Sequence, residues 1–146
     1  MQNNQKVKRV QLKVNQLNDF MLIGIVTSEP DYKLSLTLNN KFRISLKNIS
    51  PLELKDSSQS ELTFSRFSDT HNHAGLIFNL ISNRSGKLFL LNKLKNIDYI
   101  LQVHDSENVI NINELTDILR EIESVNGVFT IDINTFKDKN LHFLTL

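Results

Sequence analysis

The sequence contains no cysteine, so several kinds of protein chemistry are excluded from the start. Without thiols there are no disulfides, thiolate nucleophiles, iron–sulfur clusters or cysteine-based zinc sites. Glycine is also scarce, and its four copies lie far apart along the chain. Dinucleotide-binding and phosphate-binding loops need clustered glycines, because backbone N–H groups must closely approach the phosphate. The common signatures of enzymes are therefore lacking, and no cofactor is expected.

The chain also lacks a strong net charge and a long hydrophobic run. Its formal net charge is +1, which gives no overall field for attraction to nucleic acids or anionic membranes. The longest apolar run, residues 20–26, is far shorter than the roughly 20 residues needed to cross a bilayer. No small-residue cleavage pattern of an export signal follows it. We therefore expect a soluble, cytoplasmic protein with no membrane association.

Apolar residues are nevertheless plentiful enough for a folded core. Hydrophobic residues make up 40% of the 146 residues, and nine phenylalanines are spread along the sequence. Disordered chains contain far fewer such residues, and a single core can serve about 150 residues. We expect one domain over residues 1–146, with residues 1–18 as a partly extended basic arm.

The first helix is predicted over residues 29–40. Ser28 and Asp31 have the spacing of a helix start, with Ser28 as the N-cap and Pro30 in the first turn, where proline is tolerated. The apolar residues that follow also alternate as in a strand. We favour the helix because the cap is the more specific signal.

The second helix is predicted over residues 111–124. Asn111 and Glu114 have the spacing of a capping box, and Asn126-Gly127 would end the helix. Behind the cap, apolar residues recur at the i, i+3, i+4 and i+7 positions that face a core in an amphipathic helix. These residues are Leu115, Ile118, Leu119 and Ile122.

Most of the remaining apolar residues alternate or run together as in strands. Residues 20–26 should form a strand covered on both faces. A strand over residues 42–46 would be closed by Pro51, and residues 75–82 and 87–91 should form a hairpin. Further strands are predicted over residues 62–67, 97–103, 128–133 (the last central strand) and 141–144. The class is therefore α+β, with a largely antiparallel sheet of about six strands and one helix near each end.

The charges are segregated along the chain. Residues 1–18 carry basic but no acidic side chains, namely Lys6, Lys8, Arg9 and Lys13. Helical spacing places Glu114, Asp117 and Glu121 together on the outer side of the second helix. Three interpretations stay open for this acidic face: a solvated surface, attraction to the protein's own basic arm, or docking of a basic partner.

Asp69, His71 and His73 lie two residues apart, so their side chains would point to the same side of an extended segment. A carboxylate and two imidazoles could hold Zn²⁺ or a ferrous ion. The alternative is an exposed polar turn without a ligand role, and no fourth ligand is apparent. Metal binding here is a secondary hypothesis.

RNA binding is another alternative. The basic arm could contact phosphates, with Lys41 and Arg43 in support. Aromatic residues also stand beside basic ones around Phe42 and Phe64. Alternation, however, places these rings on the face opposite to the charges, as in any strand with one buried side. Nucleic acid is therefore not the favoured partner.

Asp98 stands in the apolar segment Ile97-Asp98-Tyr99, where aspartate is disfavoured as a strand residue. We expect its carboxylate to accept hydrogen bonds from backbone N–H groups of the turn at residues 92–96. Tyr99 should be buried on the opposite face.

Residues 91–99 resemble the signature of a bacterial family, without established activity, that is named for its motif IPExxxVDY. Residues 97–99 match its Val-Asp-Tyr, whereas Asn92 replaces proline and Lys93 replaces glutamate. Since lysine cannot serve as a catalytic carboxylate, either a function has been lost here or the motif serves the fold, and we favour the second interpretation. The sequence thus predicts a non-enzymatic binding or adaptor domain whose partner is a protein.

Overall fold

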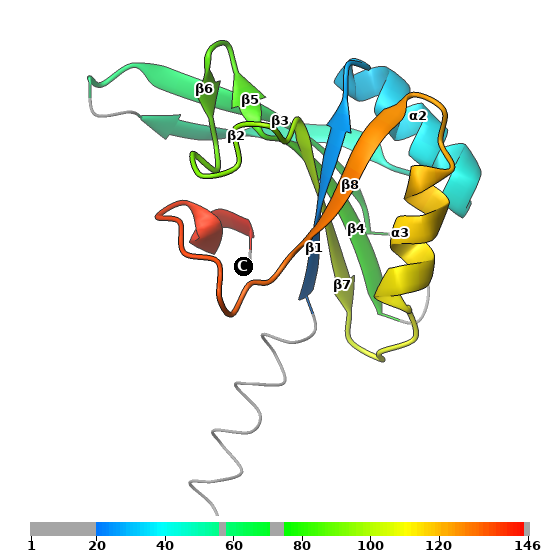
Figure 1. Ribbon diagram of the computed structural model, residues 1–146. Coiled ribbons are helices and arrows are strands. Elements are labelled where there is room, and N and C mark those ends of the chain that lie inside the picture. Colours follow the sequence, from blue (N-terminus) through cyan, green and yellow to red (C-terminus); the bar gives the residue numbers. More distant parts are fainter. Residues whose placement is uncertain (1–19, 56–57, 71–74, 145–146) are drawn as a thin grey trace, which may run out of the picture.

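The computed structural model describes residues 20–55, 58–70 and 75–144. Its centre is an antiparallel sheet of six strands in the order β2-β3-β4-β7-β1-β8 (Figure 1). The strands are β1 (Phe20–Thr27), β2 (Lys47–Lys55), β3 (Glu61–Asp69), β4 (Leu76–Ser82), β7 (Tyr99–Asp105) and β8 (Val125–Ile131). Two helices, α2 (Asp31–Phe42) and α3 (Ile112–Arg120), lie on one face. The predicted α+β class is confirmed.

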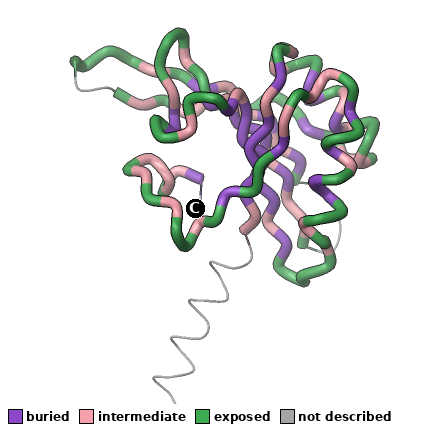
Figure 2. Tube along the Cα trace, viewed as in Figure 1, coloured by how far each residue is buried: buried purple, intermediate pink, exposed green. Residues whose placement is uncertain are grey.

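Strand β1 is buried on both faces, as its continuous apolar sequence predicts. Ile23 and Ile25 pack into the core under the helices, whereas Leu22 packs into a second core on the opposite face. All three side chains are buried. A strand buried on both faces carries a near-continuous apolar run rather than an alternating one. The neighbouring strand β7 shares this property, and Figure 2 shows the buried positions gathered along the centre of the sheet.

Helix α2 forms as predicted, but it starts differently. The N-cap is Pro30, whose side chain makes no capping hydrogen bond, so the prediction of Ser28 as the N-cap is wrong. Burial of Leu34 and Leu38 in the core under the helices holds α2 instead. The helix is therefore stabilised by tertiary packing rather than by its cap.

The chain between α2 and β2 departs from the sequence prediction. Phe42 is the last residue of α2 rather than part of a strand, and Arg43 ends the helix in a left-handed conformation with φ of 54°. Strand β2 then runs through Pro51, which was wrongly expected to close the preceding strand. Proline is tolerated because β2 is an edge strand whose register shifts between Ile49 and Leu52.

Helix α3 is the predicted amphipathic helix. The Asn111 side chain accepts hydrogen bonds from two backbone N–H groups of the first turn, and Leu115 and Leu119 are buried. The helix ends at Arg120 rather than at residue 124. Its capping signal and its apolar stripe are both local features, which is why the sequence located it well.

Two segments cover the sheet face opposite to the helices (Figure 1). One connects β4 to β7 and contains a short ribbon of β5 (Arg84–Ser85) and β6 (Leu88–Phe89). The other follows β8 and ends in the 3₁₀ helix η1 (Leu141–Leu144). Leu90, Leu91, Ile97 and Leu144 of these segments are buried against the sheet.

Several strand predictions are wrong because pairing is not a local property. Residues 75–82 pair with β3 and β7, not with residues 87–91 as predicted. Residues 141–144 form a 3₁₀ helix instead of a strand. Asn126-Gly127 lie inside β8 rather than at the end of α3, and β8 is an edge strand rather than a central one.

Replacing Leu119 by alanine tests whether α3 seals the core. Leu119 is fully buried, so Leu119→Ala should lower the free energy of unfolding by about 2–5 kcal/mol. Urea unfolding of both proteins measures this loss, with Glu123→Ala, at an exposed position, as the control. A loss below about 0.5 kcal/mol, as for a surface substitution, would contradict the packing of α3.

Candidate functional site

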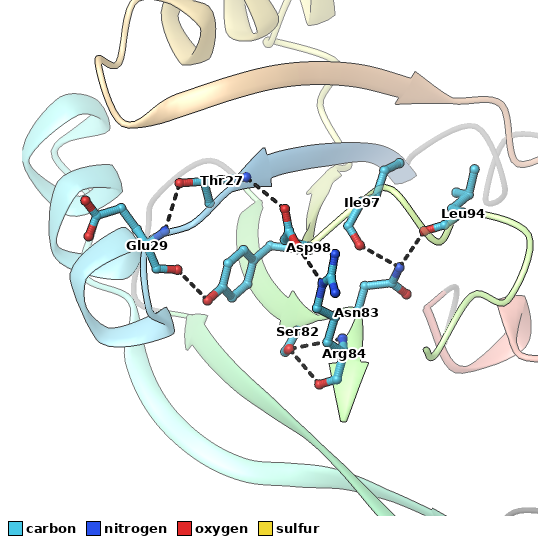
Figure 3. Close-up of polar contacts among 9 residues, drawn as sticks. Thr27, Glu29, Ser82, Asn83, Arg84, Leu94, Ile97 and Asp98 are labelled. Carbon is cyan, nitrogen blue, oxygen red and sulfur yellow. Dashed lines mark hydrogen bonds and ion pairs between the residues drawn. The ribbon is translucent and has the colours of Figure 1, made fainter. Parts of the chain in front are cut away.

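Residues 97–99 lie at a polar junction where β7 begins beside the end of β1 (Figure 3). The Asp98 carboxylate accepts a hydrogen bond from the Thr27 backbone N–H at 2.9 Å and pairs with Arg84 Nε at 2.6 Å. Asp98 therefore accepts a backbone N–H, as expected. The donor belongs to β1, however, so the prediction of donors at residues 92–96 is wrong.

Asn83, which the sequence did not single out, holds the turn that was assigned to Asp98. Its side chain is fully buried and donates to the carbonyls of Leu94 and Ile97 at 2.9 Å each (Figure 3). Its Oδ1 accepts the Leu91 N–H at 2.8 Å. A buried amide with both ends bonded fixes the path of the segment around it. An asparagine after a strand looks like any turn residue, so local sequence carried no signal for this role.

Tyr99 closes the junction on the helix side. Its hydroxyl donates to the Glu29 carbonyl at 2.8 Å. Burial, followed by the nearby carboxylates of Asp31, Asp98 and Glu29, raises the pKa of Tyr99 to about 12. The hydroxyl therefore stays a neutral donor near pH 7.

The junction is a clamp that joins separate elements of the fold. Within the described part of the chain, no buried side-chain nitrogen or oxygen lacks a hydrogen-bond partner. Arg84, the more exposed member of the ion pair, also lies over the Phe89 ring at 4.9 Å. The contacts of Asn83, Asp98 and Tyr99 tie these elements together.

The predicted metal site is described only in part. Asp69, at the end of β3, is buried and accepts the Ser45 backbone N–H at 2.7 Å. His71 and His73 lie outside the described residues, so metal binding there stays a prediction. Among the residues that are described, no three His, Asp or Glu side chains are grouped to hold a metal ion.

The aromatic residues considered for RNA binding are taken up by packing. Phe64 is fully buried, and Phe67 is buried too. Phe42 packs against the core under the helices and stacks on Phe78 at a ring distance of 6.5 Å. Bases cannot stack on rings that are covered by the fold. The basic arm of residues 1–18 lies outside the described residues, so RNA binding by the arm stays a prediction.

The acidic residues of α3 stand beside a groove. Glu114, Asp117 and Glu121 are all exposed, and Asp117 lies 3.5 Å from Arg120 in an exposed ion pair. Glu114 also lines the groove, which has a volume of about 340 Å³. The acidic face is thus continuous with a concave surface.

The groove runs between the end of α2, β4 and the first half of α3. Its lining is mainly apolar and includes Phe42, Ile44, Phe78, Val109 and Ile118. Val109 is 58% exposed. The sequence did not predict this groove, because it placed Phe42 and Ile44 in a strand. The contact of these residues with α3 depends on the turn after α2.

No protein-family model matches the chain, and no curated protein matches it either. The resemblance to the IPExxxVDY family therefore stays a prediction. In the residues that the structure describes, no helix has the length and apolarity needed to cross a membrane. The function must accordingly be argued from the surface of the fold.

Asp98→Ala tests the clamp. Removing the carboxylate leaves the Thr27 N–H without its acceptor, so the free energy of unfolding should fall by about 1–3 kcal/mol. Arg84→Ala removes the same ion pair from its more exposed side and should cost less than about 1 kcal/mol. Chemical denaturation compares the two variants. Equal losses would mean that the ion pair, not the Thr27 contact, gives Asp98 its role.

Tyr99 should make stability depend on pH in the alkaline range. Its pKa rises from 10.0 to about 12 on folding, so the folded chain keeps a proton that the unfolded chain loses. The stability contribution is therefore complete below pH 10 and is lost as the pH rises through about 12. Tyr99→Phe should flatten this loss in unfolding experiments at stepped pH. Tyr32→Phe, at an exposed tyrosine, is the control and should keep the wild-type slope.

Proposed function

We propose that the protein is a non-enzymatic binding domain whose groove between α2 and α3 receives a basic, amphipathic segment of a partner protein. One observation carries the proposal: Glu114 of α3 lines an apolar groove, and Asp117 and Glu121 are exposed further along the same segment. Apolar side chains of the segment would fill the groove, and its basic side chains would face Glu114, Asp117 and Glu121.

The shape and lining of the groove support this mode of binding. An amphipathic helix binds such a groove by placing side chains at i, i+3, i+4 and i+7 into apolar contact. Phe42, Val109 and Ile118, none of them fully buried, offer that contact. Carboxylates at the rim add little affinity but raise the association rate and exclude acidic partners.

Basic side chains near the α2 end of the groove would set the orientation of the bound segment. Lys41 and Arg43 flank Phe42 at the end of α2, and both are exposed. A segment with basic side chains on every face would be repelled by Lys41 and Arg43. The preferred partner is therefore basic on the side that faces α3 and neutral or acidic on the side that faces α2.

The test uses two synthetic amphipathic helical peptides of matched length, one with leucine and lysine and one with leucine and glutamate. The lysine peptide should bind with chemical-shift changes centred on Phe42, Val109 and Ile118, and its affinity should fall as salt rises. The triple reversal Glu114→Lys, Asp117→Lys and Glu121→Lys should weaken this binding about tenfold or more. Reversal of Glu53 and Glu61, exposed on β2 and β3, is the control at acidic positions away from the groove.

Two results would contradict the proposal. One is equal binding of both peptides, which would mean that charge plays no part. The other is binding of the lysine peptide that survives the reversal on α3 but is lost with the control reversal on β2 and β3. The second result would place recognition away from the groove.

A further inference from the structure

The two edges of the sheet are protected to different degrees. Strand β2 carries Lys47, Glu53, Lys55 and Pro51, and its register is shifted in the middle. These features discourage another strand from pairing with an edge. Strand β8 has the sequence VNGVFTI, with no charge and no proline. It is drawn in front of β1 in Figure 1, and no other described strand pairs with its outer side.

The hydrogen bonds of β1 show which groups of β8 face outward. Ile25 pairs with Val128, and the Ile25 carbonyl accepts the Asp98 N–H, so the polar groups of Ile25 point toward β7. The main-chain groups of Val128 therefore point away from β1. The Val128 carbonyl indeed accepts a bond from the Arg120 side chain at 3.1 Å. Thr130, two residues on, faces the same way, which leaves its N–H and C=O at the open edge.

Phe129 stands between these two residues and is 48% exposed. A hollow of about 370 Å³ lies beside it, with an apolar lining that includes Leu94, Ile97 and Phe136. An exposed aromatic side chain beside an apolar hollow, at an edge where no described strand is paired, is suited to pairing with a second strand. A second strand would share or displace the bond from Arg120 to the Val128 carbonyl.

We propose that two copies of this chain associate through β8, so that their sheets join into one continuous antiparallel sheet. Around a two-fold axis at Phe129, Val128 of each copy pairs with Thr130 of the other. The two Phe129 side chains then meet across the axis, each next to the hollow of the opposite copy. Such a contact is self-complementary, as a two-fold interface requires.

The surroundings of the edge favour a second copy. Arg120, half exposed, reaches the β8 edge and carries Asp117 beside it as an ion-pair partner. In an antiparallel dimer, α3 of each copy presents Arg120 and Asp117 at the interface. Arg120 of one copy can therefore meet Asp117 of the other across the two-fold axis. Glu114 and Ile118 line the groove on the other side of α3. Asp117 is shared with the acidic face of α3, whereas Phe129, on which the test of the dimer rests, lies outside the groove.

The experiment measures the mass of the full chain by light scattering and sedimentation across a micromolar dilution series. The wild type should show twice the mass of one chain. Phe129→Lys places two like charges across the axis and should raise the dissociation constant at least about tenfold. Ile49→Lys makes the same change at an exposed position on the other edge, β2, and should leave the dimer intact.

Hydrogen exchange on the unmodified chain gives a second measurement that needs no variant. The Val128 and Thr130 amides should be protected at high concentration and exchange rapidly on dilution, whereas the neighbouring Phe129 amide, which faces β1, should stay protected throughout. A wild type that is monomeric over the whole series would overturn the proposal. A dimer that Phe129→Lys leaves intact, or one whose Val128 and Thr130 amides gain no protection, would overturn it as well.

Discussion

Burial of β1 and β7 on both faces is the constraint on which the other elements depend. A sheet with an apolar centre on both sides must be covered twice. The helices α2 and α3 cover one face, and the β4–β7 connection together with the segment after β8 covers the other. Gly24 shows how closely the segment between β4 and β7 approaches the sheet, since a Cβ atom there would clash with the Ile97 side chain. A larger residue at this position would require that side chain to shift.

The polar junction supplies hydrogen-bond partners for the backbone of the segments that cover the sheet. Covering segments carry backbone N–H and C=O groups into the interior, where each unpaired group is costly. The side chains of Asn83 and Asp98 form hydrogen bonds with such groups on neighbouring elements. The Gln102 side chain likewise donates to the Leu144 carbonyl, at the end of the segment that follows β8. These side chains are polar because the backbone around them needs partners. Because Asp98 and Tyr99 make such hydrogen bonds, residues 97–99 help to hold the fold together.

The surfaces proposed as contacts lie where covering of the sheet is incomplete. On the helix face, the apolar residues between α2 and α3 are left as a groove that Glu114 also lines. At the sheet margin, β8 has a strand on one side and main-chain groups facing outward on the other. Both features combine apolar side chains with polar groups that would set the direction of approach. The two proposed contacts therefore differ in kind, since one uses side chains and the other uses the backbone.

The sequence by itself determined what depends on neighbouring residues. The cap at Asn111, the buried Leu115 and Leu119 of α3 and the doubly buried run of β1 were predicted correctly, because capping and periodicity act over a few residues. Ile118 of the predicted stripe is instead half-buried beside the groove, and Ile122 lies past the end of α3. Tertiary structure alone decided that Pro51 could stay inside a strand, since tolerance of proline depends on that strand lying at an edge. It also decided the partners of Asn83 and Asp98, which come from elements distant in sequence. The groove and the open edge of β8 follow from the same cause: they exist only once strand order has determined which elements become neighbours, and strand order is set by the packing of the whole chain.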